Sequence, residues 1–190
     1  IMTIQHNLIT GSNLHEPKGV AAASANKVYV ANGSGSGAWS ILSTTSLALP
    51  KGKFYFYNIG SPYTLAHSGS TAKVAPTTIA SGYAGLVTEA TSARLTYTGS
   101  TTATVKLDFD VSLKQASGAD RDIVIAVHRN GSVIAGSEVI MTSVTADAHQ
   151  ASGSCLYPAA TNDYFEIYAL NTGASGDMLF QKVGLTLTAT

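Results

Sequence analysis

The stretch TVKLDFDVSL, residues 104–113, alternates polar and apolar side chains without a break. Every second residue from Val105 to Leu113 is apolar, and the residues between them are Lys, Asp or Ser. Successive side chains of a β-strand point to opposite faces, so a period of two places all the apolar members on one face. The stretch therefore predicts a long strand that is buried on one side and wet on the other.

Further β patterns follow this strand toward the C-terminus. Apolar and β-branched runs predict strands at residues 122–128, 138–141, 164–170 and 178–188. Asn130-Gly131 lies between two β runs, and Asn-Gly is the strongest short-range signal for a hairpin. Turn residues recur about every ten positions and no helical periodicity intervenes. We therefore expect an all-β fold, with an antiparallel jelly-roll β-sandwich over residues 85–190.

The composition favours the same fold class. Only 12% of the 190 residues are Asp, Glu, Lys or Arg, and Ser, Thr, Gly, Ala and Asn take over the surface role. Exposed helices normally rely on Glu and Lys, so this bias favours strands and turns. The lone Cys155 excludes an intrachain disulfide, so the hydrophobic core has to hold the fold.

Charge and hydropathy argue against two classes of partner. The 11 basic and 11 acidic residues give a formal net charge of zero, and no run of Lys or Arg could neutralise a row of phosphates. No apolar stretch approaches the roughly 20 residues that span a bilayer. The first residues also lack a basic region followed by an apolar one. We expect no nucleic acid partner, no membrane insertion and no secretory signal.

Residues 1–45 differ from the rest and predict an extended arm. The small-residue run at 21–25 and the GSGSG segment at 33–37 bury little apolar surface, so an ordered arm needs a partner or a second copy. Alternating residues on either side of Asn32-Gly33 predict a short hairpin within it.

Residues 46–84 predict a β segment that connects this arm to a C-terminal knob at residues 85–190. The run KFYFY, residues 53–57, would carry aromatic side chains on both faces of a strand. Such a strand belongs in a subunit contact or in the core of a sandwich. Gly and Pro between Gly60 and Gly82 indicate turns.

The order of the C-terminal features resembles the C1q/TNF-like jelly-roll domains of bacteriophage structural proteins. The resemblance is carried by LTYTG at residues 95–99, the strand through Leu107 and Phe109, HRNG at 128–131 and ATNDYFEI at 160–167. Together with a last strand that ends at the C-terminus, it covers about half of the chain. Domains of this family are usually trimers, so the resemblance implies a homotrimer formed through the knob.

The arm also resembles a segment that recurs near the front of phage virion proteins. The resembling residues are Asn13 to Gly19, then VYVANG at 28–33 and Trp39. The resemblance implies attachment to a particle, and the attachment residues it indicates are Leu14, His15, Glu16, Pro17, Lys18, Tyr29 and Trp39. The chain lacks the shaft repeats of a long tail fibre, which favours a head fibre or capsid decoration protein that contacts the major capsid protein or another virion protein.

No set of residues predicts a catalytic or metal site, and we expect a protein that is not an enzyme and needs no cofactor. The five histidines are dispersed without metal-ligand spacing. Asp108 and Asp110 share one strand face about 7 Å apart, which is near the separation of glycosidase carboxylates. Lys106 lies on the same face, however, and the alternation predicts that this face is solvated. Cys155 is expected to be a small buried hydrophobic residue.

Tyr157, Tyr164 and Tyr168 are the candidate surface or trimer contacts. Tyrosine is favoured at protein and carbohydrate contacts. Packing in the core or in the trimer is the commoner explanation for such a group.

These observations predict a phage virion structural protein that is made in the host cytoplasm and located in the virion, on the capsid surface rather than the tail. The alternative is a receptor- or carbohydrate-binding tail fibre tip with a host surface glycan as its partner. A glycan depolymerase that uses Asp108 and Asp110 is a third hypothesis.

Overall fold

The computed structural model describes residues 27–31, 37–41, 49–90, 93–173 and 176–190. The chain divides into two compact units, Ile1–Leu47 and Ala48–Thr190. Every described secondary-structure element is a β-strand. No helix in this described part is long and apolar enough to cross a membrane.

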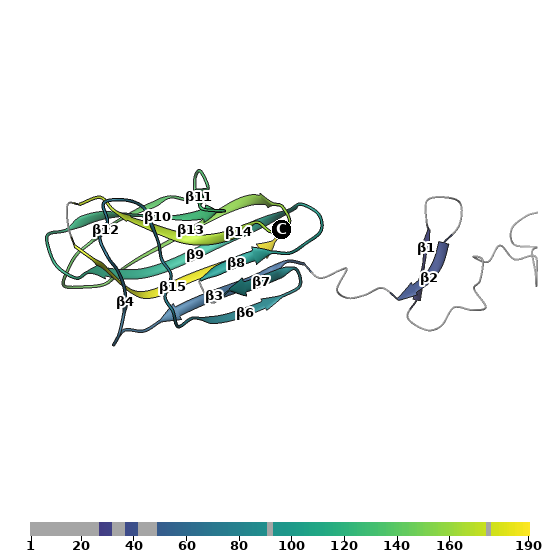
Figure 1. Ribbon diagram of the computed structural model, residues 1–190, viewed down its shortest axis with the longest axis horizontal. Helices are drawn as coiled ribbons and strands as arrows, with labels where there is room; N and C mark the ends of the chain where they lie inside the picture. The colour runs from purple at the N-terminus through teal and green to yellow at the C-terminus, as the bar shows by residue number, and fades with distance from the viewer. Residues whose placement is uncertain (1–26, 32–36, 42–48, 91–92, 174–175) are drawn as a thin grey trace, which may run out of the picture. The chain divides into compact units, whose positions relative to one another are not determined.

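The described part of the second unit consists of two antiparallel sheets around one hydrophobic core (Figure 1). Its strands are β3 (Lys51–Tyr57), β4 (Tyr63–Leu65), β5 (Ala72–Lys73), β6 (Ala80–Ala84), β7 (Val87–Ala90), β8 (Arg94–Tyr97), β9 (Ala103–Gln115), β10 (Arg121–Arg129), β11 (Ser132–Val133), β12 (Val139–Ser143), β13 (His149–Ala159), β14 (Tyr164–Asn171) and β15 (Met178–Ala189). The β9 sheet has the order β13-β9-β15-β3-β6, and β4 pairs with β15 beside it. The β10 sheet has the order β11-β10-β14-β8-β7, with β12 paired to β10 and β5 to β14.

The predicted long strand is β9, and it lies between β13 and β15 in its sheet. Val105, Leu107 and Leu113 are fully buried, whereas Lys106 is exposed. The core is completed from the β10 sheet, where the inward side chains include Ile125 and Phe165. Burying one such side chain stabilises a fold by about 1.5–3 kcal/mol, so the two inner faces hold the sandwich together.

The predicted Asn-Gly hairpin is confirmed. Asn130 and Gly131 both have positive φ, 51° and 82°, as a type I′ turn requires, and they join β10 to β11. The Asn130 amide also ties this turn to the loop before β14, because its Nδ2 donates to Asp163 Oδ1 at 2.8 Å and its Oδ1 accepts from Tyr164 N at 3.0 Å.

Residues 46–84, which we expected to connect an arm to the knob, contribute β3 to β6 to the sandwich itself. Strand β3 pairs with β15 over its whole length and buries Phe54 and Phe56 in the core. The compact unit therefore begins near residue 48 rather than near residue 85.

Strand β13 has no counterpart among the predicted strands. It pairs with β9 over its full length, from His149 opposite Leu113 to Ala159 opposite Ala103. A Cβ at Gly153 would lie 2.6 Å from the Phe109 ring, so glycine is required for β13 to pack closely over that ring.

The described part of the first unit is the predicted short hairpin. Strands β1 (Lys27–Ala31) and β2 (Gly37–Ile41) are antiparallel, with Tyr29 opposite Trp39. The two rings meet edge to face with centroids 5.5 Å apart. The other expected attachment residues, Leu14 to Lys18, lie outside the described residues.

Leu107→Ala should lower the free energy of unfolding by about 2–5 kcal/mol, because it leaves a cavity at the centre of the core. Thr104→Ala is the control on the exposed face of the same strand, and it should change stability by less than about 0.5 kcal/mol. Urea unfolding followed by far-UV circular dichroism measures both. Equal losses in the two variants would contradict the inward orientation of Leu107.

Candidate functional site

The outer face of the β9 sheet exposes large apolar side chains. Tyr55 and Tyr57 alternate with the buried Phe54 and Phe56, and they are 46% and 65% exposed. Leu156 lies on β13 opposite Lys106, so it belongs to the same outer face, and it is 63% exposed. Charged and hydroxyl-bearing side chains occupy the positions between Leu156 and the two tyrosines, so this face is a mixed surface on which three large apolar side chains are available for contact with another protein. We call Tyr55, Tyr57 and Leu156 the apolar face.

A hollow lies at the centre of this face. Gly184 of β15 is paired with Tyr55 on one side and Asp110 on the other, and it has no side chain to fill the space between them. A Cβ at Gly184 would lie 2.8 Å from Asp110 Oδ1. The resulting depression has a volume of about 330 Å³ and is bordered by Lys53, Asp108 and Lys182 as well. A side chain from another molecule can enter this space.

Both aspartates at the hollow are paired with lysines of the same chain. Lys106 Nζ lies 2.8 Å from Asp108 Oδ1, and Lys182 Nζ lies 3.0 Å from Asp110 Oδ2. All four side chains are between 39% and 47% exposed. Each aspartate is therefore half of an ordinary surface ion pair on an open sheet, an arrangement that gives neither carboxylate the environment of a general acid.

A buried carboxylate lies on the outer face of the other sheet. Glu166 of β14 is 2% exposed, and its Oε1 accepts from Lys73 Nζ at 2.5 Å and from Arg94 Nε at 2.8 Å. The Tyr168 hydroxyl lies 3.4 Å from Oε2. Two cations from β5 and β8 compensate one carboxylate on β14, so this group links three strands of the β10 sheet.

Tyr164 and Tyr168 lie on either side of Glu166 on β14 and are both engaged by neighbours. The Arg94 guanidinium lies 3.9 Å from the centroid of the Tyr164 ring. The Tyr168 ring stacks on His128 with centroids 3.9 Å apart and planes inclined by 13°. Desolvation, together with the Glu166 charge, raises the pKa of Tyr168.

Tyr157 belongs to the other sheet and does not join this pair. Its ring faces inward from β13 and meets Phe165 edge to face, with centroids 6.0 Å apart. The Arg129 guanidinium donates to its hydroxyl, and that bond, followed by the Asp163 charge, raises the pKa of Arg129. The structure therefore brings together two of the candidate tyrosines, in contacts within the chain, and separates the third.

The other chemical candidates are also accounted for by packing. Burial, followed by the Asp108 charge, raises the pKa of Cys155, which is the opposite of what a nucleophilic thiol needs. No group of three or more His, Cys, Asp or Glu in the described part of the chain is arranged to hold a metal ion.

The sequence pattern indicated only part of these surfaces. The aromatic run at residues 53–57 predicted a strand in a subunit contact or a core, and the structure places one half of it in the core and exposes the other half. Leu156, Gly184 and the Glu166 cluster were not predicted. Glu166 occupies a polar position of an alternating strand, where the pattern alone indicates exposure.

Comparisons with known proteins relate the chain to others by fold only. No protein family model matches it, and no curated protein does. The Eiger TNF of S. frugiperda matches 75% of this chain and 93% of its own, with a TM-score of 0.50 and 10% sequence identity. The PRD1 vertex protein P5 matches 74% of this chain and 96% of its own at 12% identity, with a TM-score of 0.48. Murine APRIL matches 72% and 98% at 10% identity, with a TM-score of 0.45.

The Eiger match and the strand order agree with the expected fold. The sandwich is a jelly roll of the TNF type, built entirely from antiparallel strands where the structure describes it.

Glu166→Gln should lower the free energy of unfolding by about 2 kcal/mol, because it leaves two cations without a counter-charge and both cations are partly exposed. Glu138→Gln is the matched control, since Glu138 is exposed and glutamine keeps the oxygen that accepts from Gly136 N. It should change stability by less than about 0.5 kcal/mol. Chemical denaturation of the two variants tests the difference. If Glu166→Gln leaves the free energy of unfolding unchanged, the cluster does not stabilise the β10 sheet.

Proposed function

We propose that the chain is a non-enzymatic structural protein of a phage particle, and that it forms homotrimers through its jelly roll and attaches through its N-terminal arm. The observation that carries the proposal is the apolar face, with its hollow over Gly184, on the outside of a TNF-type sandwich. A second copy of the chain that covers this face would remove the three apolar side chains from water and could place a side chain in the hollow.

The local chemistry supports assembly more than catalysis. Tyrosine side chains supply large contact area at a small cost in conformational entropy, and Tyr55 and Tyr57 stand beside the hollow. Asp108 and Asp110 are already paired with lysines in one copy, so covering them leaves neither carboxylate without a partner. Lys53 makes no ion pair among the described residues and lies over the Tyr55 ring, so a partner copy would have to supply its counter-charge. A lasting interface of this kind buries about 1,600 Å² or more in total.

In a closed ring each copy presents one patch to the next copy and receives a different patch from the previous one. The apolar face is one such patch. Ile140, on the edge strand β12, is 68% exposed and is a candidate for the second. The C1q/TNF-like resemblance favours closure after three copies.

Attachment is assigned to residues 1–45. The Tyr29–Trp39 hairpin is two-stranded, and Val30 on its other face is 50% exposed. An isolated two-stranded hairpin is at best marginally stable in water, so a surface of the major capsid protein or another virion protein would stabilise it. We place the protein on the capsid, as a decoration protein or head fibre.

Leu156→Asp should shift the protein from trimer toward monomer, with at least about a tenfold rise in the dissociation constant, because an apolar contact is lost and a carboxylate has to give up its water in the interface. Thr88→Asp introduces the same charge on the outer face of the β10 sheet and should leave the trimer intact. Sedimentation equilibrium over a range of concentrations gives the masses. A monomeric parent protein at micromolar concentration would refute the assembly proposal.

Antibodies raised against the chain should label the capsids of phage particles released from cells that produce it. Electron microscopy of gold-labelled particles distinguishes the locations. Label at the tail tip would replace the capsid proposal by that of a tail protein, and the absence of label from purified particles would refute a virion role.

A further inference from the structure

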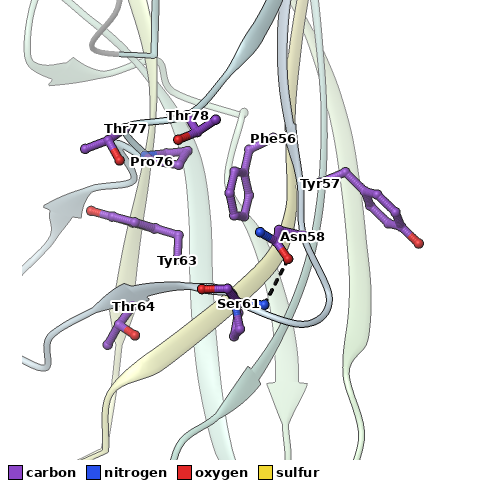
Figure 2. A pocket seen from close by; sticks show the side chains of 10 residues that line it. Phe56, Tyr57, Asn58, Ser61, Tyr63, Thr64, Pro76, Thr77 and Thr78 are labelled. Atoms are coloured by element: carbon purple, nitrogen blue, oxygen red, sulfur yellow. Dashed lines mark hydrogen bonds between the residues drawn. The ribbon is translucent and has the colours of Figure 1, made fainter.

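A second hollow lies where loops of the two sheets meet. Figure 2 shows it between the turn that follows β3, strand β4 and the segment that follows β5. Strand β4 pairs with β15 of the β9 sheet, whereas β5 pairs with β14 of the β10 sheet. The cavity has a volume of about 340 Å³, at the lower end of the range for small-molecule sites.

The lining of this cavity is aromatic and polar but carries no charge. The residues are Phe56, Tyr57, Asn58, Ser61, Pro62, Tyr63, Thr64, Pro76, Thr77 and Thr78, and none of them is acidic or basic. A ligand that owes its affinity to a phosphate, carboxylate or ammonium group would find no counter-charge here. The lining instead suits a neutral molecule with several hydroxyl groups.

Two aromatic rings are fixed in place to form the walls. Phe56 is 7% exposed and belongs to the core, and the Tyr63 ring packs on Phe180 with centroids 6.4 Å apart. In Figure 2 the Tyr63 ring extends across the cavity, with Pro76 and Thr77 on one side of it and Ser61 and Thr64 on the other. A rigid ring of this kind can receive the apolar face of a sugar ring while its hydroxyl group stays in water.

Asn58 supplies a donor of fixed orientation. Its Oδ1 accepts from Ser61 N at 2.9 Å, and its backbone N donates to Gln181 O at 2.9 Å. These two bonds hold the residue at the start of the turn, and the amide nitrogen is turned toward the Phe56 and Tyr63 side in Figure 2. The two N–H groups of that nitrogen can therefore donate to ligand oxygens.

We propose that this cavity binds a neutral saccharide, with one pyranose ring against Tyr63 and a hydroxyl group bonded to the Asn58 amide. The hydroxyl groups of the threonine and serine residues around the ring complete the polar contacts. The cavity adjoins the assembly surface at Tyr57, which is one of its lining residues, but the Tyr57 ring points away from the cavity in Figure 2 and is exposed on the apolar face.

Saturation-transfer difference NMR and calorimetry on the full chain test this proposal with glucose, galactose, mannose and N-acetylglucosamine, and with glucuronic acid as the charged comparison. At least one neutral sugar should bind at millimolar concentration and should bind more tightly than glucuronic acid. The proposal is overturned if none of the four neutral sugars binds, or if the acid is preferred.

Asn58→Asp is the decisive variant, because it keeps an oxygen that accepts from Ser61 N but replaces both donors by a charged oxygen. It should weaken sugar binding by at least about tenfold with no change in melting temperature. Asn162→Asp makes the same change in the exposed loop before β14 and should bind sugar like the parent. Tyr63→Leu keeps an apolar contact with Phe180 and should also lose the sugar. If Asn58→Asp binds sugar as tightly as the parent protein, the sugar binds at another surface and the proposal for this cavity is wrong.

Discussion

The alternation shared by β3, β15 and β9 is the constraint on which the rest of the structure depends. Leu185 of β15 is paired with Phe54 on one side and Phe109 on the other, and all three are buried. A slip of one residue in either pairing would expose a set of apolar side chains to water, so the core fixes the register. The same register places Tyr55, Gly184 and Asp110 in one row on the outer face. The same strand register therefore determines both the core and the hollow above it.

The strands with strong local alternation could be predicted from the sequence, and the rest depend on distant partners. Strands β9, β10, β14 and β15 lie close to their predicted ranges because β9 and β15 alternate over much of their length and β10 and β14 are continuous runs rich in apolar residues. Strand β13 was missed because Ala151, Gly153 and Cys155, three of its inward residues, are too small to give a clear apolar period. Its identity as a strand comes from its pairing with β9.

The surfaces that the sequence predicted likewise depend on local pattern, whereas the unpredicted ones depend on residues far apart in the chain. The partners of Glu166 are 93 and 72 residues away in the sequence, so no local pattern could show that its carboxylate is buried between cations. Tyr164 and Tyr168 share a face because each lies two residues from Glu166 along β14. Tyr157 belongs to a strand that was not predicted. The saccharide cavity likewise joins segments that pair with different sheets.

The bond from Ala189 N to Pro50 O, 2.8 Å long, ties the last strand of the sandwich to the residue that precedes β3. From there β3 runs for seven residues, about 20 Å, before the chain reaches Asn58 at the opposite pole. The sandwich thus has one end at which the chain enters β3, and an opposite end that carries Tyr63. A ligand in the cavity beside Tyr63 would therefore bind one full strand length away from the end at which the chain enters the sandwich.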